Sequence, residues 1–576
     1  MKRREFIGGM VAAGTSPLFG VAGDGGERIA RIGLITDTHV ETTLESCSRV
    51  RAALSLFKAK GAEMVINCGD IADRHYPQGY RFYRQTVNEV FPDPASRPKE
   101  IFVYAWHDLI NHDKVLGGKW DPVAAYANVR KQLEAPNPPF CDFVWKGLPF
   151  VVATQNVGIK GFPSWEEYEK TVERVCAANP GKPVFVCDHL PPAGTTFHSR
   201  EWGSERCRRM LNRFPQVVSL SGHVHGSLAN ERQIWQGEFT AVNIGCLQTW
   251  GGFASGSTPP RQAKPNFGAI VMDVFADRLV FHRHDVRDGS EIAPPWVVPL
   301  PFDPSAAPYA PARAAARVKR LPAFNDGAKV EVKPVASGFE VKFDDATTPQ
   351  AFMYRIQCER RNALGEWEAF SRDDVFSEFW KAKADRTGVI SHVLASGFFS
   401  PRGEYRVSVR PLDFFYRAGA DIASQAATMP GEPAPEELWK IEPPARKLRF
   451  TEYNEAVAET VGGRFAPSTG QGALWLPENA FANLVPGKRH QLVLDLDSCL
   501  PDGDWCGWRV RLAPRSGGSV SASSALTASG SPGTLRYVFT FTTPADGSFP
   551  ASCNITFNNH LPGASLRVAG IRLLRG

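Results

Sequence analysis

The sequence predicts an α/β domain followed by two all-β sandwich domains. Between about residues 28 and 298, short apolar strands alternate with amphipathic helical stretches, as in βαβ units around a buried sheet. After a Pro- and Ala-rich break the chain changes to short alternating runs separated by turn residues, which is typical of antiparallel sandwiches. The 576 residues are too many for one core, and a composition of 43% hydrophobic and 22% charged residues indicates a globular protein.

The first 22 residues predict an export signal. A charged head, Lys2-Arg3-Arg4, precedes a short, mildly apolar stretch and small residues near position 22. The arginine pair followed by Phe6-Ile7 resembles a twin-arginine signal, whereas the alternative is an uncleaved basic tail. We therefore expect an exported bacterial protein, periplasmic or extracellular. No other stretch reaches the roughly 18 apolar residues of a membrane span, so we expect no transmembrane segment in the mature chain.

Charge and cysteine content exclude some classes of function. The net charge is +6, and no run of Lys and Arg marks a nucleic-acid groove, so no dedicated nucleic-acid binding is expected. The eleven cysteines show no CxxC spacing, which argues against a zinc finger or a disulfide framework.

Within the α/β domain, predicted at residues 28–298, strands and helices follow one another along the chain. Strands are predicted at 29–37, 62–70, 99–106, 150–156, 182–189 and 217–226. Helices are predicted at 46–61, 165–181 and 200–214, and Gly61 is the expected stop of the first one.

The C-terminal half is predicted to contain a linker and two β-sandwiches. Residues 299–327 are Pro- and Ala-rich and predict a linker, and residues 328–430 resemble a fibronectin type III-like module. Residues 440–576 predict a second sandwich, of the jelly-roll or carbohydrate-binding kind. Three tryptophans lie near its turns, where aromatic side chains can either stack on sugar rings or fill the core: Trp475, Trp505 and Trp508. A carbohydrate is therefore a candidate partner of this domain.

Polar blocks follow five strands of the α/β domain, at the sheet edge where α/β proteins bind ligands. The blocks are Asp37-Thr38-His39, Gly69-Asp70-Ile71-Ala72-Asp73, Trp106-His107-Asp108, Asp188-His189 and Gly222-His223-Val224-His225. Every block offers a metal-ligating side chain. A mixture of carboxylates and imidazoles suits Fe, Mn or Zn more than Ca or Mg.

These blocks resemble the motifs of the calcineurin-like metallophosphoesterases, the broad family that includes the purple acid phosphatases. The family pattern is DxH, GDxxD, GNH(D/E), a lone His and GHxH. The resemblance covers residues 28–290 and implies a two-sheet α/β sandwich with two divalent or trivalent metal ions at the strand ends, Fe, Mn or Zn.

The resemblance also implies a role for each residue. Asp37, His39 and His225 would hold the first metal, Asp70 would bridge both metals, and His189 and His223 would hold the second. His107 would be the phosphate-contacting acid, and Asp108 would orient the His107 ring and fix its tautomer.

The sequence departs from the family at Trp106, which stands where the family has asparagine. An indole cannot ligate a metal, because its N–H is only a donor. Three outcomes are open: water replaces the ligand, Asn111 supplies its carbonyl, or the second site is weakened and one metal binds. An alternative alignment places Asn111-His112-Asp113 in the family position.

Two functions from different classes follow. The first is an exported metal-dependent phosphoesterase, which hydrolyses a phosphodiester or phosphomonoester through a metal-bound hydroxide. The alternative is a periplasmic or surface protein that binds a glycan or a partner and carries a degenerate metallophosphoesterase site. Trp106 separates the two, because an indole that fills the second metal position favours binding and an indole that lies aside favours the enzyme.

Overall fold

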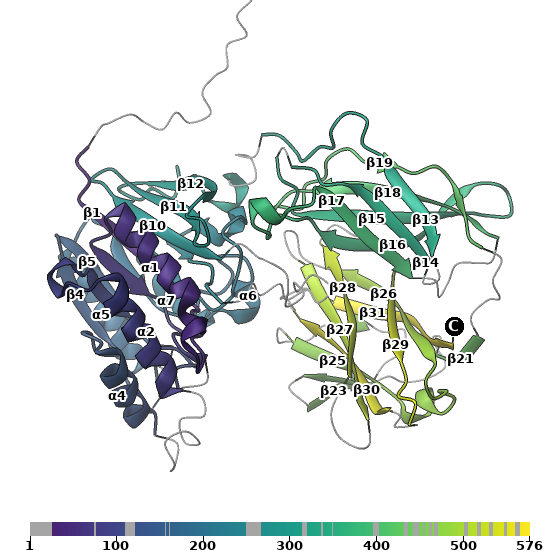
Figure 1. Ribbon diagram of the computed structural model, residues 1–576, viewed down its shortest axis with the longest axis horizontal. Helices are drawn as coiled ribbons and strands as arrows, with labels where there is room; N and C mark the ends of the chain where they lie inside the picture. Colours follow the sequence, from purple (N-terminus) through teal and green to yellow (C-terminus); the bar gives the residue numbers. More distant parts are fainter. Residues whose placement is uncertain are drawn as a thin grey trace, which may run out of the picture.

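The computed structural model of the protein describes residues 26–575 with gaps, and it contains an α/β region followed by two all-β regions (Figure 1). The gaps are 74–75, 110–120, 156, 160–161, 249–266, 314–318, 336–337, 348, 396–401, 431–435, 442–448, 453–454, 460–463, 466–470, 500–504, 515–519, 529–533, 547–549 and 559–564. The predicted export signal lies outside the described residues. Among the helices that are described, none is long and apolar enough to cross a membrane.

The first sheet of the α/β region has six strands in the order β12-β11-β10-β1-β2-β3. Their bounds are β1 Ala30–Ile35, β2 Met64–Asn67, β3 Lys99–Phe102, β10 Gly268–Val274, β11 Arg278–Asp285 and β12 Glu291–Pro299. Strands β1, β2 and β3 run parallel, with Ile35 opposite Asn67 and Asn67 opposite Phe102. The residues that follow these three strands therefore emerge at the same edge of the sheet.

The second sheet also has six strands, in the order β4-β5-β6-β7-β9-β8. Their bounds are β4 Cys141–Trp145, β5 Leu148–Val152, β6 Val184–Cys187, β7 Val217–Ser221, β8 Ile234–Gln236 and β9 Thr240–Asn243. The pairs β5–β6, β6–β7 and β7–β9 are parallel. Strand β5 overlaps the predicted strand 150–156, whereas β4 was not among the predicted strands.

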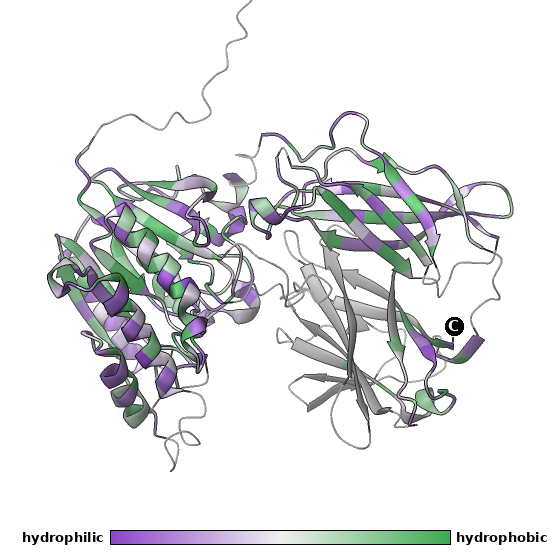
Figure 2. Ribbon diagram, viewed as in Figure 1, coloured by the Kyte–Doolittle hydropathy of each residue, from purple (hydrophilic) through white to green (hydrophobic). Residues whose placement is uncertain are grey.

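The two sheets pack face to face, and helices cover their outer faces. Ile32 and Leu34 of β1 share one buried cluster with Val218 and Leu220 of β7. The helices α1 Ser48–Lys60, α2 Pro77–Val90 and α4 Pro122–Leu133 pack on the first sheet, and α5 Trp165–Ala178 and α7 Glu205–Leu211 pack on the second. Figure 2 shows the apolar strands of this region in green beside helices with many hydrophilic residues. The predicted two-sheet α/β sandwich is confirmed.

Two of the three predicted helices keep their predicted form. Helix α1 ends at Gly61, whose φ of 70° is the left-handed conformation that glycine adopts readily. Helix α5 begins with a capping box formed by Ser164 and Glu167.

The third predicted helix, residues 200–214, is broken in two. A short helix α6, Ser199–Trp202, ends before Gly203, and Ser204 caps α7 by accepting a hydrogen bond from the Cys207 N–H. A Cβ on Gly203 would lie 2.2 Å from the Ser199 carbonyl oxygen and 2.6 Å from that of Pro191. The chain therefore passes closely against itself here, and this turn directs α6 toward the edge of the sheets.

The segment predicted as a linker is partly packed against the α/β region. Tyr309 is 3% exposed and belongs to the core between the sheets. Its hydroxyl accepts a hydrogen bond from the Val297 N–H at 2.8 Å, and its own N–H donates to Gln236 Oε1 at 3.1 Å. The linker prediction is therefore wrong around Tyr309, because one aromatic side chain in a Pro- and Ala-rich stretch is enough to dock it.

The next region is an antiparallel sandwich, called the first β-sandwich below. Its sheets are β13-β14-β17 and β16-β15-β18-β19, with β20 paired to β18. The bounds are β13 Val330–Val335, β14 Gly338–Asp344, β15 Met353–Arg361, β16 Trp367–Phe376, β17 Val389–Ala395, β18 Glu404–Leu412, β19 Ile422–Ala423 and β20 Ala427–Thr428. Phe339, Tyr354 and Val407 are buried between the sheets.

The last region is a second β-sandwich with sheets β21-β31-β26-β29 and β23-β22-β25-β30-β27-β28, and β24 pairs with β31. The bounds are β21 Glu436–Ile441, β22 Arg449–Glu452, β23 Glu455–Glu459, β24 Arg464–Phe465, β25 Gln471–Leu476, β26 Arg489–Cys499, β27 Trp505–Pro514, β28 Val520–Ala528, β29 Thr534–Thr542, β30 Pro550–Asn558 and β31 Ser565–Arg575. Two all-β regions were predicted, and both are present. Trp475 is half-buried, whereas the side chains of Trp505 and Trp508 lie outside the described residues.

Candidate metal centre

The six predicted metal ligands gather at the carboxyl ends of β1, β2, β6 and β7. They form two groups whose ligand atoms lie within 4.8 Å of one another. The first group is Asp37, His39, Asp70 and His225, and the second is Asp70, His189 and His223. Because Asp70 belongs to both groups, its carboxylate occupies the position expected of a bridging ligand.

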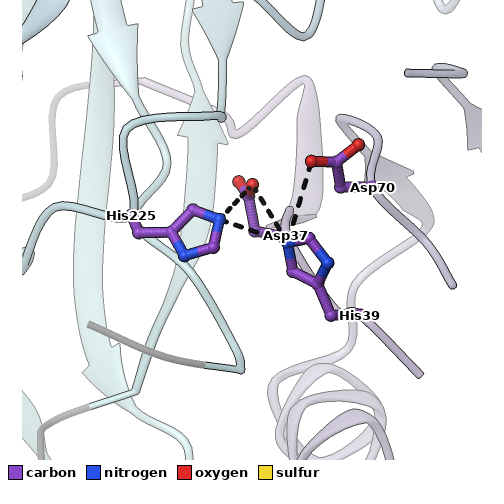
Figure 3. Close-up of side chains that lie close together, drawn as sticks. All are labelled: Asp37, His39, Asp70 and His225. Carbon is purple, nitrogen blue, oxygen red and sulfur yellow. Dashed lines mark hydrogen bonds and ion pairs between the residues drawn. The ribbon is translucent and has the colours of Figure 1, made fainter. Parts of the chain in front are cut away.

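Figure 3 shows the four side chains of the first group converging on one point. His225 Nε2 lies 2.9 Å from Asp37 Oδ1 and 3.2 Å from His39 Nε2. His39 Nε2 lies 3.7 Å from Asp70 Oδ2. Two imidazoles and two carboxylates thus present nitrogen and oxygen atoms to a shared space, a donor set that suits Fe, Mn or Zn.

The two oxygens of Asp37 have different surroundings. Oδ2 accepts hydrogen bonds from the Thr36 hydroxyl at 2.8 Å and from the His223 N–H at 2.9 Å. Oδ1 is buried and lies 2.9 Å from His225 Nε2 and 3.8 Å from His39 Nε2. A buried carboxylate is costly unless a positive charge neutralises it. A metal ion in the first group would do so, and the residues present therefore fit a metal.

The second group is centred on His189, whose side chain is fully buried. Its Nδ1–H donates to the Cys68 carbonyl oxygen at 2.8 Å, and this contact leaves Nε2 as the ligating nitrogen. That Nε2 lies 3.2 Å from Asp70 Oδ2 and 3.2 Å from His223 Nδ1. The other oxygen of Asp70 accepts the His107 N–H at 3.1 Å.

His107 lies at the mouth of the centre, with 37% of its side chain exposed. Its ring centroid is 4.7 Å from that of His39, in an edge-to-face arrangement. Its Nδ1–H donates to Asp73 Oδ1 at 3.2 Å, which leaves Nε2 for a substrate. Asp73 was quoted in the GDxxD block, but it received no role from the sequence.

The orienting role predicted for Asp108 is wrong, because the carboxylate that contacts the His107 ring is that of Asp73. Asp108 is fully buried and faces the backbone. Its carboxylate accepts hydrogen bonds from four groups: the N–H groups of Ile71, Ala72 and Ala105, and the Tyr80 hydroxyl. Asp108 thus fixes the loop that carries Asp70 instead of the imidazole beside it in the chain.

Trp106 belongs to neither ligand group, and 44% of its surface is exposed. Its backbone N–H donates to Gln155 Oε1 at 2.8 Å, a contact that the sequence did not suggest. Asn111, the predicted substitute ligand, and the alternative Asn111-His112-Asp113 block lie outside the described residues.

The charges of the centre depend on protonated histidines. Burial raises the pKa of Asp37, yet His225 and His189 hold that pKa well below its usual range. Burial lowers the pKa of His39, but its contacts with the carboxylates of Asp37 and Asp73 raise that pKa to about 10. In the same way the nearby Asp70 carboxylate raises the pKa of buried His189 to about 9. The protons on these imidazoles supply the positive charge that a metal would supply in their place.

Five of the six predicted ligands have a left-handed backbone. The φ angles are 50° at Asp37, 37° at His39, 49° at Asp70, 73° at His223 and 48° at His225. Such a conformation costs a residue with a Cβ about 1–2 kcal/mol. Hydrogen bonds between loops hold it in place, among them Asp37 N–H to Gly69 O and His39 N–H to Asp70 O, both 2.9 Å.

The comparisons with known proteins agree with this geometry. Residues 30–227 match the family model described as calcineurin-like phosphoesterase, a range that includes all six ligands and His107. No curated protein matches the chain.

Similar solved structures include a dimetal phosphatase from Danio rerio, with 12% identity and a TM-score of 0.32, covering 47% of this chain and 99% of that one. The sulfate thiohydrolase SoxB from Thermus thermophilus is similar at 11% identity and a TM-score of 0.26, covering 51% and 61%. A tandem CBM22 domain of Xyn10C from Paenibacillus barcinonensis is similar at 11% identity and a TM-score of 0.16, covering 45% and 93%. The family match, together with the two-sheet fold, shows that the N-terminal region is a calcineurin-like metallophosphoesterase domain.

Proposed function

We propose that the protein is an exported metal-dependent phosphoesterase that hydrolyses a phosphodiester or a phosphomonoester. The observation that carries the proposal is the pair of ligand groups that share Asp70, with the buried carboxylate of Asp37 facing two imidazoles in the first group. Export is proposed from the Arg3-Arg4 signal motif.

Asp37, His39, Asp70 and His225 would hold one metal, and Asp70, His189 and His223 the other. When bound, two metals in such a site acidify water and offset charge on phosphate oxygens. Binding releases the protons from His39 and His189, because only a neutral imidazole ligates a metal. Metal affinity should therefore fall as the pH is lowered.

His107 is proposed as the acid that completes the reaction. Asp73 holds its Nδ1–H, which leaves Nε2 of this partly exposed ring for proton transfer. Water adds to phosphorus and releases one proton to solvent while the bond to the ester oxygen breaks. His107 Nε2 donates its proton to that leaving oxygen and then takes up a proton from solvent, which restores the starting state. The products are an alcohol and either a phosphate monoester or phosphate.

The test uses the chain expressed with its signal in a host with twin-arginine export and recovered from the periplasmic fraction. We expect about two metals per chain by elemental analysis and hydrolysis of bis(p-nitrophenyl) phosphate or p-nitrophenyl phosphate. His107→Ala should lower turnover about a hundredfold or more and leave the metal content unchanged. A chain that binds no metal even with added Mn²⁺ or Zn²⁺ would sink the proposal, and cytoplasmic retention would sink export alone.

The rival function, glycan or partner binding with a degenerate centre, required the indole of Trp106 to fill the second metal position. The exposure of Trp106 and the compactness of the Asp70–His189–His223 group favour the enzyme. A carbohydrate partner for the second β-sandwich stays a proposal, and a metal-free chain that binds a glycan array would favour the rival.

A further inference from the structure

The α/β domain and the first β-sandwich meet in an aromatic cluster. Phe197, on the segment that follows His189, packs with Phe352, Phe376, Phe379 and Phe414 of the first β-sandwich. The Phe197 and Phe352 ring centroids are 5.8 Å apart in an edge-to-face arrangement, and Phe352 is fully buried. The segment around Phe197 in the α/β domain is thus packed against the neighbouring domain.

Arg232 connects a second segment, the one that follows His225, to the same aromatic cluster. It lies in the short 3₁₀ helix Glu231–Gln233, which follows His225, and its carbonyl oxygen accepts the Phe197 N–H at 2.9 Å. Its guanidinium carbon lies 5.2 Å from the Phe197 ring centroid and 5.5 Å from that of Tyr416 in the first β-sandwich. The guanidinium is therefore in contact with one ring from each domain.

Polar contacts at a separate place keep the two domains in the same arrangement. Arg287 Nη1 donates to Asp385 Oδ2 at 2.9 Å. Lys383 Nζ donates to the Glu291 carbonyl oxygen at 2.9 Å. The two domains are therefore joined by polar contacts as well as by the aromatic cluster.

A short path leads from the aromatic cluster to the second ligand group. His198 follows Phe197 directly, with ring centroids 4.2 Å apart, and it is 4% exposed in a left-handed conformation with φ 66°. Its carbonyl oxygen accepts the Trp202 N–H at 3.1 Å within α6. The Trp202 ring then packs edge-to-face on the His223 ring, with centroids 5.9 Å apart.

We propose that the first β-sandwich positions the second metal site. Through Phe197 it fixes α6, and through α6 it fixes Trp202 against His223, so that the imidazole stays oriented toward His189 and Asp70. Phe352, Phe197 and Trp202 are thus positioning residues that act through His223. The inference rests on the proposed metal centre.

The physical reason is the small number of ligands in the second group. Within the part of the chain that the structure describes, the group contains His189 and His223 besides the shared Asp70, and the indole of Trp106 offers no ligand atom. His189 is fixed by Cys68, whereas His223 depends on its packing neighbours for orientation. A ligand that is oriented in advance loses less freedom on binding, and losing such support typically costs about 10–100-fold in metal affinity.

The experiment compares two equivalent truncations within the first β-sandwich of the full-length chain. Phe352→Ala removes the ring that anchors Phe197, whereas Phe339→Ala removes an equally buried ring from the sandwich core that is remote from the interface. Mn²⁺ titration calorimetry and elemental analysis follow the two binding steps separately. For Phe352→Ala we expect the tighter step to be unchanged and the weaker step to lose about tenfold in affinity. Phe339→Ala should leave both steps at the wild-type values.

Tyr416→Ala serves as a milder second variant if Phe352→Ala does not fold, since it removes a ring that contacts Arg232 and Phe352 but leaves the Phe352 ring in place. In this variant the affinity of the weaker metal-binding step should fall about two- to fivefold. Equal second-step affinities in the wild type, the interface variants and Phe339→Ala would overturn this inference while leaving the proposed function intact. A wild-type chain without any bound metal would instead remove the proposed function itself.

Discussion

The two ligand groups differ in how they are assembled. The first group is complete within the α/β domain, with four ligands, two of them on the loop that follows β1. The second has three, one of which it shares, and it is flanked by Trp202 from a segment anchored in another domain. The first group thus lies within the α/β domain, whereas the second also contacts a segment that packs against another domain.

The largest expected effect comes from Asp70, because it joins the two groups. Asp70→Asn removes the shared charge but keeps the shape and the acceptor for the His107 N–H. We expect both metals to be lost or weakened together and turnover to fall about a thousandfold or more. Elemental analysis and hydrolysis assays check this. Loss of only one metal would contradict the shared role of Asp70, because the two ligand groups would then be independent.

A smaller effect is expected from the carboxylate that holds His107. Asp73→Asn should lower turnover about 10–100-fold and leave the metal content unchanged, because the imidazole loses its charged partner. Steady-state kinetics measure the turnover.

Asp108→Asn is the matched control, since it changes a buried carboxylate that accepts backbone N–H groups. It should lower the free energy of unfolding by about 2–3 kcal/mol, because an amide N–H₂ would face backbone donors. A reversed result, with Asp108→Asn affecting turnover and Asp73→Asn affecting only stability, would restore the sequence-based assignment.

The smallest effect is expected at Trp106 and concerns the second group alone. Trp106→Asn restores the family residue, and its carbonyl should raise the affinity of the weaker metal step about tenfold. Metal titration measures both steps, and the tighter step should not move. If Asn111 already serves as the ligand, Trp106→Asn will have no effect and Asn111→Ala will weaken the second step instead.

Much of the fold and most of the ligand set could be predicted from the sequence. Runs such as 29–37 and 62–70 are apolar enough to identify buried strands, and the polar residues directly after them must lie at the sheet edge. The clustering of Asp37, Asp70 and His225 could be expected because each follows a strand closely, whereas their roles as ligands came from the family resemblance.

What the sequence did not reveal depends on contacts between distant segments. The pairing of Asp73 with His107 follows from how two loops fold over each other, so adjacency in the chain favoured Asp108 wrongly. The break at Gly203 lies inside a helical pattern and results from close backbone packing. The docking of Phe197 on another domain leaves no periodic signal, since one aromatic residue in a loop has no pattern.

The left-handed ligand residues have a consequence for the stability of the chain. At Asp37, His39, Asp70, His223 and His225 a glycine would relieve about 1 kcal/mol or more of backbone strain. Each such replacement would also remove side-chain contacts, such as the hydrogen bonds that Asp37 and Asp70 accept. The strain at these five positions is therefore a cost that the fold carries while it presents the candidate ligands at the sheet edge.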